Sequence, residues 1–374
     1  MRHRRDWVWA LGVLALLLAG LPPAARAVSI ATRSPLVALD SEGIAAVHFD
    51  VFLCDVCDTT SQIYQLKHIS VFADRSVVFS LTRRNLDGST GTTTTVASGT
   101  GSQAAFDDLL RALDEARFEG QHPDCAVEIV RNLEPPRPDS ILTERTRDRY
   151  TLHAFGDSGR IDRLSLGSEA PTLCRQEIRG AVVAVLDYAE RATRGSLPPQ
   201  TGVAVTLPPL VELAGEGTAK LSIKLLFDAS PLVEPMFALR NLTIFTDGSV
   251  ASVLTRSIDQ ATTRVATGRG TEAAFATLRG KLDAAGFPAW RGGDCFVTRN
   301  RSLPPSHDGV TQGVREATKD AYVIHAVDAA GGIHELDLDP NKARKACPGP
   351  LRQAVLAILD YVESATGGPL QPPL

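Results

Sequence analysis

Short runs rich in β-branched and apolar residues, broken by turn residues, recur along the chain and predict strands. The first group is expected over 45–53, 66–72 and 77–81, and a second hairpin over 149–155 and 160–166. The turn at Asp74-Arg75 corresponds to Asp247-Gly248 further along the chain. An Asp-Gly step between such runs is a strong hairpin signal, because glycine tolerates positive φ.

Apolar residues at helical spacing follow each group of strands. Phe106, Leu109 and Leu113 form one such stripe, and Ser102 stands where a helix N-cap is expected. A second helix is expected over about 175–193. Strands that come in runs, with helices after them, predict the α+β class with a mostly antiparallel sheet.

The order of these blocks occurs twice, at nearly constant spacing. Ile69–Arg83 matches Leu242–Arg256, and Arg179–Thr193 matches Arg352–Thr366, both at an offset of 173 residues. The sequence therefore predicts two tandem copies of one α+β domain, each a mostly antiparallel sheet with two packed helices. The expected division is copy one over 36–194, a proline-bearing linker over 195–208 and copy two over 209–367.

The first 27 residues have the pattern of an export signal. Arg2, Arg4 and Arg5 precede an unbroken apolar run over 7–20, and Ala25-Arg26-Ala27 fits a cleavage site. A membrane anchor is the alternative, but this run is shorter than the roughly 20 residues that a span needs. We therefore expect an exported protein, periplasmic or extracellular, with no membrane span after cleavage; general secretory and twin-arginine export both stay open.

The composition excludes some classes of function but does not identify an activity. The chain has 374 residues, a formal net charge of −4 and 44% hydrophobic residues, which is typical of a globular protein. Without a basic excess, nucleic acid is not an expected partner. We found no nucleotide-binding, metalloprotease or serine-hydrolase motif, and we expect no cofactor and no metal site.

Six cysteines in an exported chain point to disulfides. Cys125 and Cys295 occupy one repeated position, and Cys174 and Cys347 occupy another. The economical pairing is therefore Cys125–Cys174 and Cys295–Cys347, one within each copy. Free thiols or metal ligands are the alternative, but other ligand residues do not cluster near either pair.

Cys54 and Cys57 form a C-x-x-C motif that copy two lacks. A redox-active dithiol is one interpretation. The motif follows a strand and precedes a turn, and Asp55 and Asp58 would raise a thiol pKa, so we favour a local structural disulfide.

The C-x-x-C, the Asp-Gly-type hairpin, the helix, the second hairpin and the last helix together resemble a group of exported bacterial domains with no assigned function. The resemblance covers most of each copy. It implies an exported location and an α+β fold, and it brings no catalytic residue.

His153 and His325 stand at one repeated strand position, each preceded by a tyrosine, Tyr150 and Tyr322. These four residues are the candidate functional residues. Because the neighbours on the same strand face are mostly apolar, we favour a packed, hydrogen-bonded histidine over a catalytic or ligand-binding one.

Two further segments are rich in polar residues. Glu335, Asp337 and Asp339 alternate along one strand and suggest cation binding, but a solvated strand face is the simpler interpretation. The polar run over 87–95 is expected to be an exposed hairpin extension.

These observations favour an exported, non-catalytic binding or structural module of the bacterial cell envelope, with an unknown ligand or protein partner. The alternative is a thiol-disulfide active envelope protein that uses Cys54 and Cys57.

Overall fold

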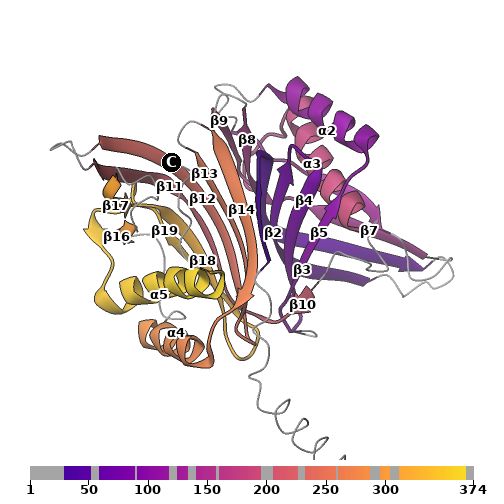
Figure 1. Ribbon diagram of the computed structural model, residues 1–374. Helices are drawn as coiled ribbons and strands as arrows, with labels where there is room; N and C mark the ends of the chain where they lie inside the picture. The colour runs from indigo at the N-terminus through magenta and orange to yellow at the C-terminus, as the bar shows by residue number, and fades with distance from the viewer. Residues whose placement is uncertain are drawn as a thin grey trace, which may run out of the picture.

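Two large sheets and two pairs of helices make up most of the part of the chain that the structure describes. The computed structural model describes residues 29–51, 59–88, 91–117, 124–133, 140–156, 160–194, 205–225, 232–257, 260–286, 295–303 and 311–367. Figure 1 shows the two sheets standing side by side, with one helix pair on the outer face of each. The result is four layers in the order helices, sheet, sheet, helices.

The first of these sheets, the N-terminal sheet, has nine antiparallel strands. They are β2 (Pro35–Val51), β3 (Thr59–Phe72), β4 (Ser76–Asn85), β5 (Thr93–Thr100), β6 (Ile129–Leu133), β7 (Ser140–Thr146), β8 (Arg149–Phe155), β9 (Ile161–Leu166) and β10 (Val205–Leu207). The order is β10-β5-β4-β3-β2-β7-β6, and β8 and β9 continue the sheet from β2. The long β2 pairs with β8 along its first half and with β7 along its second.

The second, the C-terminal sheet, has the same plan. Its strands are β1 (Ser29–Arg33), β11 (Pro209–Leu225), β12 (Leu232–Phe245), β13 (Ser249–Ser257), β14 (Ala261–Arg269), β16 (Arg299–Leu303), β17 (Thr311–Thr318), β18 (Ala321–Val327) and β19 (Ile333–Leu338). The order is β1-β14-β13-β12-β11-β17-β16, with β18 and β19 continuing from β11. A separate two-stranded parallel pair joins β15 (Cys295–Phe296) to β20 (Lys345–Ala346).

Each sheet is completed by a strand from the other half of the chain. β1 immediately precedes β2, yet it pairs with β14, with Thr32 opposite Arg264. β10 immediately precedes β11, yet it pairs with β5, with Thr206 opposite Thr95. The two halves therefore exchange their first strands reciprocally, and 205–207, which we expected to be linker, is part of a sheet.

This architecture corrects the expected fold class. The chain is mostly β, with two large antiparallel sheets and four described helices, and it does not form two self-contained tandem α+β domains. The sequence pattern predicted strands that are too short, because β2 and β3 continue well beyond the apolar runs that predicted them. It also missed the exchange, because strand pairing across the two halves leaves no signal in nearby residues.

Helices α2 (Gln103–Ala116) and α3 (Gln176–Arg194) cover the N-terminal sheet, and α4 (Glu272–Ala285) and α5 (Gly349–Ala365) cover the C-terminal sheet. Ser102 caps α2 as expected, since its hydroxyl accepts a hydrogen bond from the Ala105 backbone N–H at 3.2 Å. Each helix pair buries an apolar core against its own sheet. Burial of this apolar surface is the main stabilising contribution to each half.

In each half, a disulfide joins the segment after the first helix to the segment before the last helix. Cys125–Cys174 lies in the N-terminal half and Cys295–Cys347 in the C-terminal half, with Cα–Cα separations of 4.8 and 4.7 Å. The pairing predicted from the sequence is therefore confirmed. Cys54 and Cys57 lie outside the described residues, and so does the expected signal peptide over 1–27.

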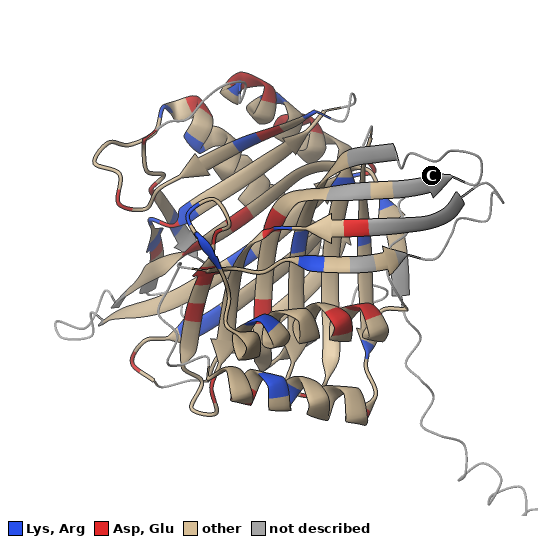
Figure 2. Cartoon of the chain, turned by 90° about the vertical axis from the view of Figure 1, so that its left-hand side faces the viewer, with Lys and Arg blue, Asp and Glu red and all other residues tan. Residues whose placement is uncertain are grey.

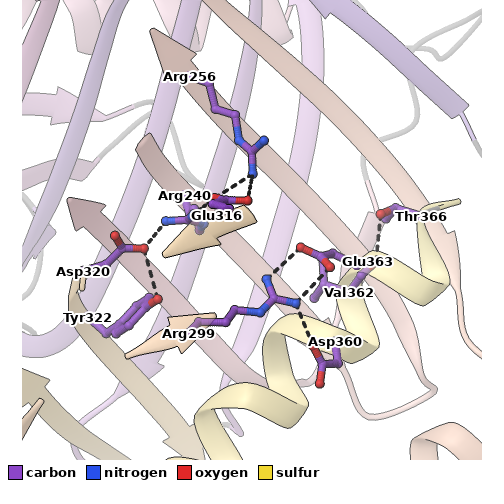
Figure 3. Close-up of polar contacts among 10 residues, drawn as sticks. All are labelled: Arg240, Arg256, Arg299, Glu316, Asp320, Tyr322, Asp360, Val362, Glu363 and Thr366. Carbon is purple, nitrogen blue, oxygen red and sulfur yellow. Dashed lines mark hydrogen bonds and ion pairs between the residues drawn. The ribbon is translucent and has the colours of Figure 1, made fainter. Parts of the chain in front are cut away.

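Ion pairs lie within the C-terminal sheet and between that sheet and α5 (Figure 3). Arg240 on β12 contacts Asp320, which also accepts a hydrogen bond from the Tyr322 hydroxyl at 3.0 Å. Arg256 reaches Glu316 at 3.3 Å, and Arg299 on β16 clamps Asp360 and Glu363 of α5. Each buried charge has a partner of opposite sign, which is the condition for tolerating such groups in a protein interior, although Asp320 Oδ1 accepts no hydrogen bond from the described residues.

Charged residues of both signs are interspersed over the helices and strands of the view in Figure 2. In the part of the chain that the structure describes, no helix has the length and apolar character that a membrane span requires.

Candidate functional site

The two sheets meet through the faces that point away from the helices, and we call this contact the seam. A small apolar cluster lies there, formed by Ala38, Phe155 and Leu239, with Phe237 packed against it. Much of the remaining seam is polar, which is unusual for a contact between two sheets. The polar residues are Asp40, Glu42, His68, Thr82, Thr94, His153, Glu212, Glu216, Asn241 and His325.

Two groups of hydrogen bonds cross the seam between strands of different sheets. Glu212 on β11 accepts hydrogen bonds from the hydroxyls of Thr82 and Thr94, the second at 3.0 Å. Asp40 on β2 accepts one from the Asn241 amide at 3.1 Å, and the Nδ1 of His68 lies 2.8 Å from the same oxygen. These bonds fix the register of one sheet on the other.

Thr92 and Thr94 are fully buried, at 4% and 0% exposure. The expectation of an exposed extension over 87–95 is therefore wrong for these residues. A threonine-rich strand looks solvent-exposed from the sequence, because the sequence does not reveal that a second sheet covers it.

His153 and His325 form two reciprocal pairs across the seam. His325 on β18 places its Nε2 3.3 Å from a carboxylate oxygen of Glu42 on β2. His153 on β8 places its Nε2 3.5 Å from a carboxylate oxygen of Glu216 on β11. Each candidate histidine thus faces a glutamate of the opposite sheet, and both histidines are almost completely buried.

Glu42 is the more heavily contacted glutamate. Its carboxylate accepts a hydrogen bond from the Tyr64 hydroxyl at 2.8 Å and also contacts the Arg149 guanidinium. Burial by itself would raise the pKa of Glu42, but the hydrogen bond and charge of His325, together with Arg149 and Tyr64, lower that pKa to about 2. Burial and the neighbouring Glu42 carboxylate raise the pKa of Tyr64.

The two pairs differ in the residue opposite the histidine on the adjacent strand. Glu335 on β19 lies opposite His325, whereas Arg163 on β9 lies opposite His153. Burial and the Glu42 charge raise the pKa of Glu335. Burial alone would also raise the pKa of Glu216, but His153 and Arg163 hold that pKa below its usual value.

A cavity of about 370 Å³ opens beside the Glu42–His325 pair. Both of these residues line it, together with Arg149, Asp337, Asp339 and Lys342. Of the two histidines, His325 is the one that reaches this cavity. The carboxylates of Asp337 and Asp339 lie 4.0 and 3.3 Å from the Lys342 ammonium, so the cavity carries charges of both signs.

A larger cavity of about 920 Å³ lies between α4, the start of β11, the β18–β19 turn and residues 91–93 of the N-terminal half. Its apolar lining includes Leu210, Phe275, Leu282, Ala326 and Val327. The charged residues Arg279, Asp283, Asp328 and His334 also line it. The volume and the mixture of apolar walls with a few polar groups are those of a small-molecule site.

Sequence differences between α2 and α4 explain why apolar residues of α4 line this cavity. In α2, Phe106, Leu109 and Leu113 are all buried, and Leu110 packs against the same core. In α4 only Leu278 and Ala285 are buried, while Phe275 and Leu282 remain partly exposed. The residue of α4 that corresponds to Leu110 is Arg279, which lines the cavity instead of filling it.

The candidate tyrosines have a different role from the histidines. Tyr150 and Tyr322 belong to the apolar cores on the helix side of each sheet, so they point away from the seam. Burial and the charge of Asp148 raise the pKa of Tyr150, and burial and the charge of Asp320 raise that of Tyr322. The structure therefore separates the tyrosines from the histidines that neighbour them in the sequence.

Sequence reasoning missed Glu42 and Glu216 as partners of the histidines. They stand at corresponding positions of β2 and β11, 174 residues apart, and this repeated glutamate was the available signal. A glutamate within a strand normally indicates a solvated edge or face, so this repeat did not by itself predict a buried partner.

Comparisons with known proteins identify no relative. No protein-family model matches the chain, and no match is found among curated proteins. Among solved structures, Neisserial surface protein A aligns over 63% of this chain and 96% of its own, at 5% sequence identity and a TM-score of 0.11. A TM-score this low carries no argument about fold or function.

Proposed function

We propose that the chain is an exported binding protein of the bacterial cell envelope, and that its ligand site is the cavity beside α4. The ligand expected there is a small molecule with an apolar body and a polar group. The N-terminal sequence pattern supports export, and the two disulfides are compatible with an oxidising compartment.

The main support for the proposal is that the two helix pairs cover their sheets to different extents. The N-terminal core is closed by Phe106 and Leu113 of α2, whereas Phe275 and Leu282 of α4 line about 920 Å³ of space. The cavity is open to solvent, so these apolar side chains remain partly in contact with water. A ligand that occupied the cavity would bury that apolar surface.

The polar residues at this cavity suggest how a ligand would be oriented. His334 places its Nε2 2.9 Å from Asp328, and Arg279 and Asp283 stand one turn apart on α4. A polar head group would therefore face charged side chains, while the remainder of the ligand would contact Leu210, Phe275 and Leu282.

The test uses 1-anilinonaphthalene-8-sulfonate, a probe with apolar rings and one anionic group. Leu282→Trp places a bulky ring in the cavity wall and should weaken saturable probe binding by about tenfold or more. Thr277→Trp, on the exposed face of α4, introduces the same side chain outside the cavity and should leave binding unchanged. Circular dichroism of both variants establishes that each is folded.

Two outcomes would contradict the proposal. The first is probe fluorescence that rises without saturation, as non-specific adsorption produces. The second is equal affinity in the folded Leu282→Trp and Thr277→Trp variants.

A further inference from the structure

The Glu42–His325 pair has a third potential ligand that the Glu216–His153 pair lacks. One ligand atom from each of Glu42, His325 and Glu335 lies within 4.8 Å of the others. They come from β2, β18 and β19, so both sheets contribute. The set consists of one imidazole and two carboxylates, which are ordinary ligands for divalent transition metals.

Strand register explains why the three residues converge. Glu335 is directly opposite His325 in the antiparallel β18–β19 pair, so both side chains project to the same face of the C-terminal sheet. That face is the seam, where Glu42 projects from the opposite sheet. The cluster therefore depends on the packing of the two halves and not on any local motif.

We propose that Glu42, His325 and Glu335 form a zinc-binding site in the seam. The Nε2 of His325 and the nearer oxygen of Glu42 are 3.3 Å apart. Two ligands of one tetrahedral zinc ion stand about 3.4 Å apart, given bond lengths near 2.0–2.1 Å. This pair is already at ligand spacing, and Glu335 needs only a small side-chain movement to complete the set.

Arg149 is the competitor for this site. Its guanidinium contacts Glu42 and lies 3.5 Å from Glu335, where it balances the two negative charges. The Arg149 side chain is 51% exposed, so it can turn into solvent when a divalent cation takes its place. Removing the arginine should therefore strengthen metal binding.

The cavity of about 370 Å³ gives the site access to solvent. Glu42 and His325 both line that cavity, so an ion can enter without separating the sheets. Three protein ligands leave one position of a tetrahedral ion for water or a small anion.

The second pair provides a comparison within the same molecule. His153 and Glu216 repeat the histidine–glutamate geometry, but Arg163 stands where the other pair has Glu335. Arg163 lies 3.3 Å from Glu216 and cannot act as a ligand. Zinc should bind at Glu42–His325 and not at Glu216–His153.

The experiment is zinc titration of the full mature chain without an affinity tag, by calorimetry and by competition with a chromophoric chelator. The protein is kept oxidised and treated with a thiol-alkylating reagent, so that no thiol binds the ion. The variants are Glu335→Gln, Glu335→Arg, Arg149→Ala, His325→Gln and the matched control His153→Gln. Circular dichroism checks that each variant is folded. If the buried substitution His325→Gln prevents folding, the variants of Glu335, whose side chain is 41% exposed, still test the site.

The proposal predicts one zinc ion per chain. Glu335→Gln and Glu335→Arg should weaken the affinity by about tenfold or more, and Arg149→Ala should strengthen it several-fold. His153→Gln should bind zinc as the unmodified protein does. A cobalt-loaded sample should show the absorption of a four-coordinate site, and Glu335→Gln should remove it.

Three results would overturn the proposal. One is the absence of stoichiometric zinc binding at millimolar zinc. Another is an unchanged affinity in Glu335→Gln. The third is a loss of zinc affinity in His153→Gln as large as the loss in Glu335→Gln, which would assign the binding to another histidine.

Discussion

His68 and Asn241 occupy corresponding positions on β3 and β12, and both reach the same oxygen of Asp40. The Nδ1 of His68 lies 2.8 Å from Asp40 Oδ1, and the Asn241 amide donates to that oxygen at 3.1 Å. Asp40 belongs to the N-terminal sheet, so Asn241 reaches it across the seam. One carboxylate thus binds the equivalent residues of both halves, but only one of these residues titrates.

This difference predicts a pH-dependent contribution to stability. Burial alone would lower the pKa of His68, but the hydrogen bond and charge of Asp40, with the charges of Glu212 and Glu42, raise it above 6.5. A raised histidine pKa stabilises the fold fully below pH 6.5, and the contribution is lost as the pH rises through the folded-state pKa. His68→Asn should flatten the fall in stability above that pH, since asparagine keeps a donor to Asp40 at every pH.

Urea unfolding of the unmodified chain and His68→Asn at several pH values from 5 to 9 measures this effect, with Asn241→Ala as a control that leaves His68 in place. The same decline above pH 6.5 in His68→Asn would exclude His68 as its source.

Because the first strands are exchanged, a substitution in the first strand of one half should destabilise the sheet of the other half. Thr32 on β1 and Thr206 on β10 are exposed, equivalent residues opposite Arg264 and Thr95. Proline at either site removes a backbone N–H and disrupts pairing, at a cost of about 1–3 kcal/mol. Hydrogen exchange should show Thr32→Pro exposing the amides of β14, and Thr206→Pro those of β5.

Each of these proline variants is the control for the other, because the substitution and the strand position are the same. If Thr32→Pro increased exchange in β5 while β14 stayed protected, the reciprocal pairing would be incorrect.

The disulfides should stabilise their own halves independently. Cys174→Ser opens a loop between residues 49 apart in the sequence. The chain-entropy contribution of such a loop is up to about 4 kcal/mol, so the N-terminal half should become less stable by a few kcal/mol. Non-reducing peptide mapping should still recover the Cys295–Cys347 peptide. Cross-linking of Cys125 to Cys295 in the unmodified protein would contradict this arrangement.

Because β14 lies close to α5 at Gly268, any larger residue at this position should destabilise the fold. A Cβ atom there would lie 1.9 Å from the Ala365 carbonyl oxygen, a backbone atom that cannot move aside. Gly268→Ala should therefore cost about 3 kcal/mol or more in the free energy of unfolding. Gly280→Ala, on the exposed face of α4 with no atom nearby, should instead add about 1 kcal/mol. Denaturant unfolding compares the two variants, and equal stabilities would show that α5 does not approach β14 this closely.

The sequence alone was sufficient for features that depend on neighbouring residues or on the repeated pattern. The Ser102 cap, the apolar stripe of α2 and the Asp247-Gly248 turn follow from local hydrogen bonding and backbone freedom, and Gly248 has φ 80°. The disulfide pairing followed from the repeated cysteine positions, because equivalent positions in similar halves have equivalent neighbours.

Only the tertiary structure decided which surfaces these elements share. Exchange of β1 and β10 depends on the edges of β14 and β5, which lie far away along the chain. Burial of Thr94 and the pairing of His325 with Glu42 depend on how one sheet covers the other. Alternation along a strand shows which side chains share a face, but it does not show whether water or a second sheet lies against that face. For that reason the histidines were recognised from the sequence, whereas their glutamate partners and the cavity beside His325 were not.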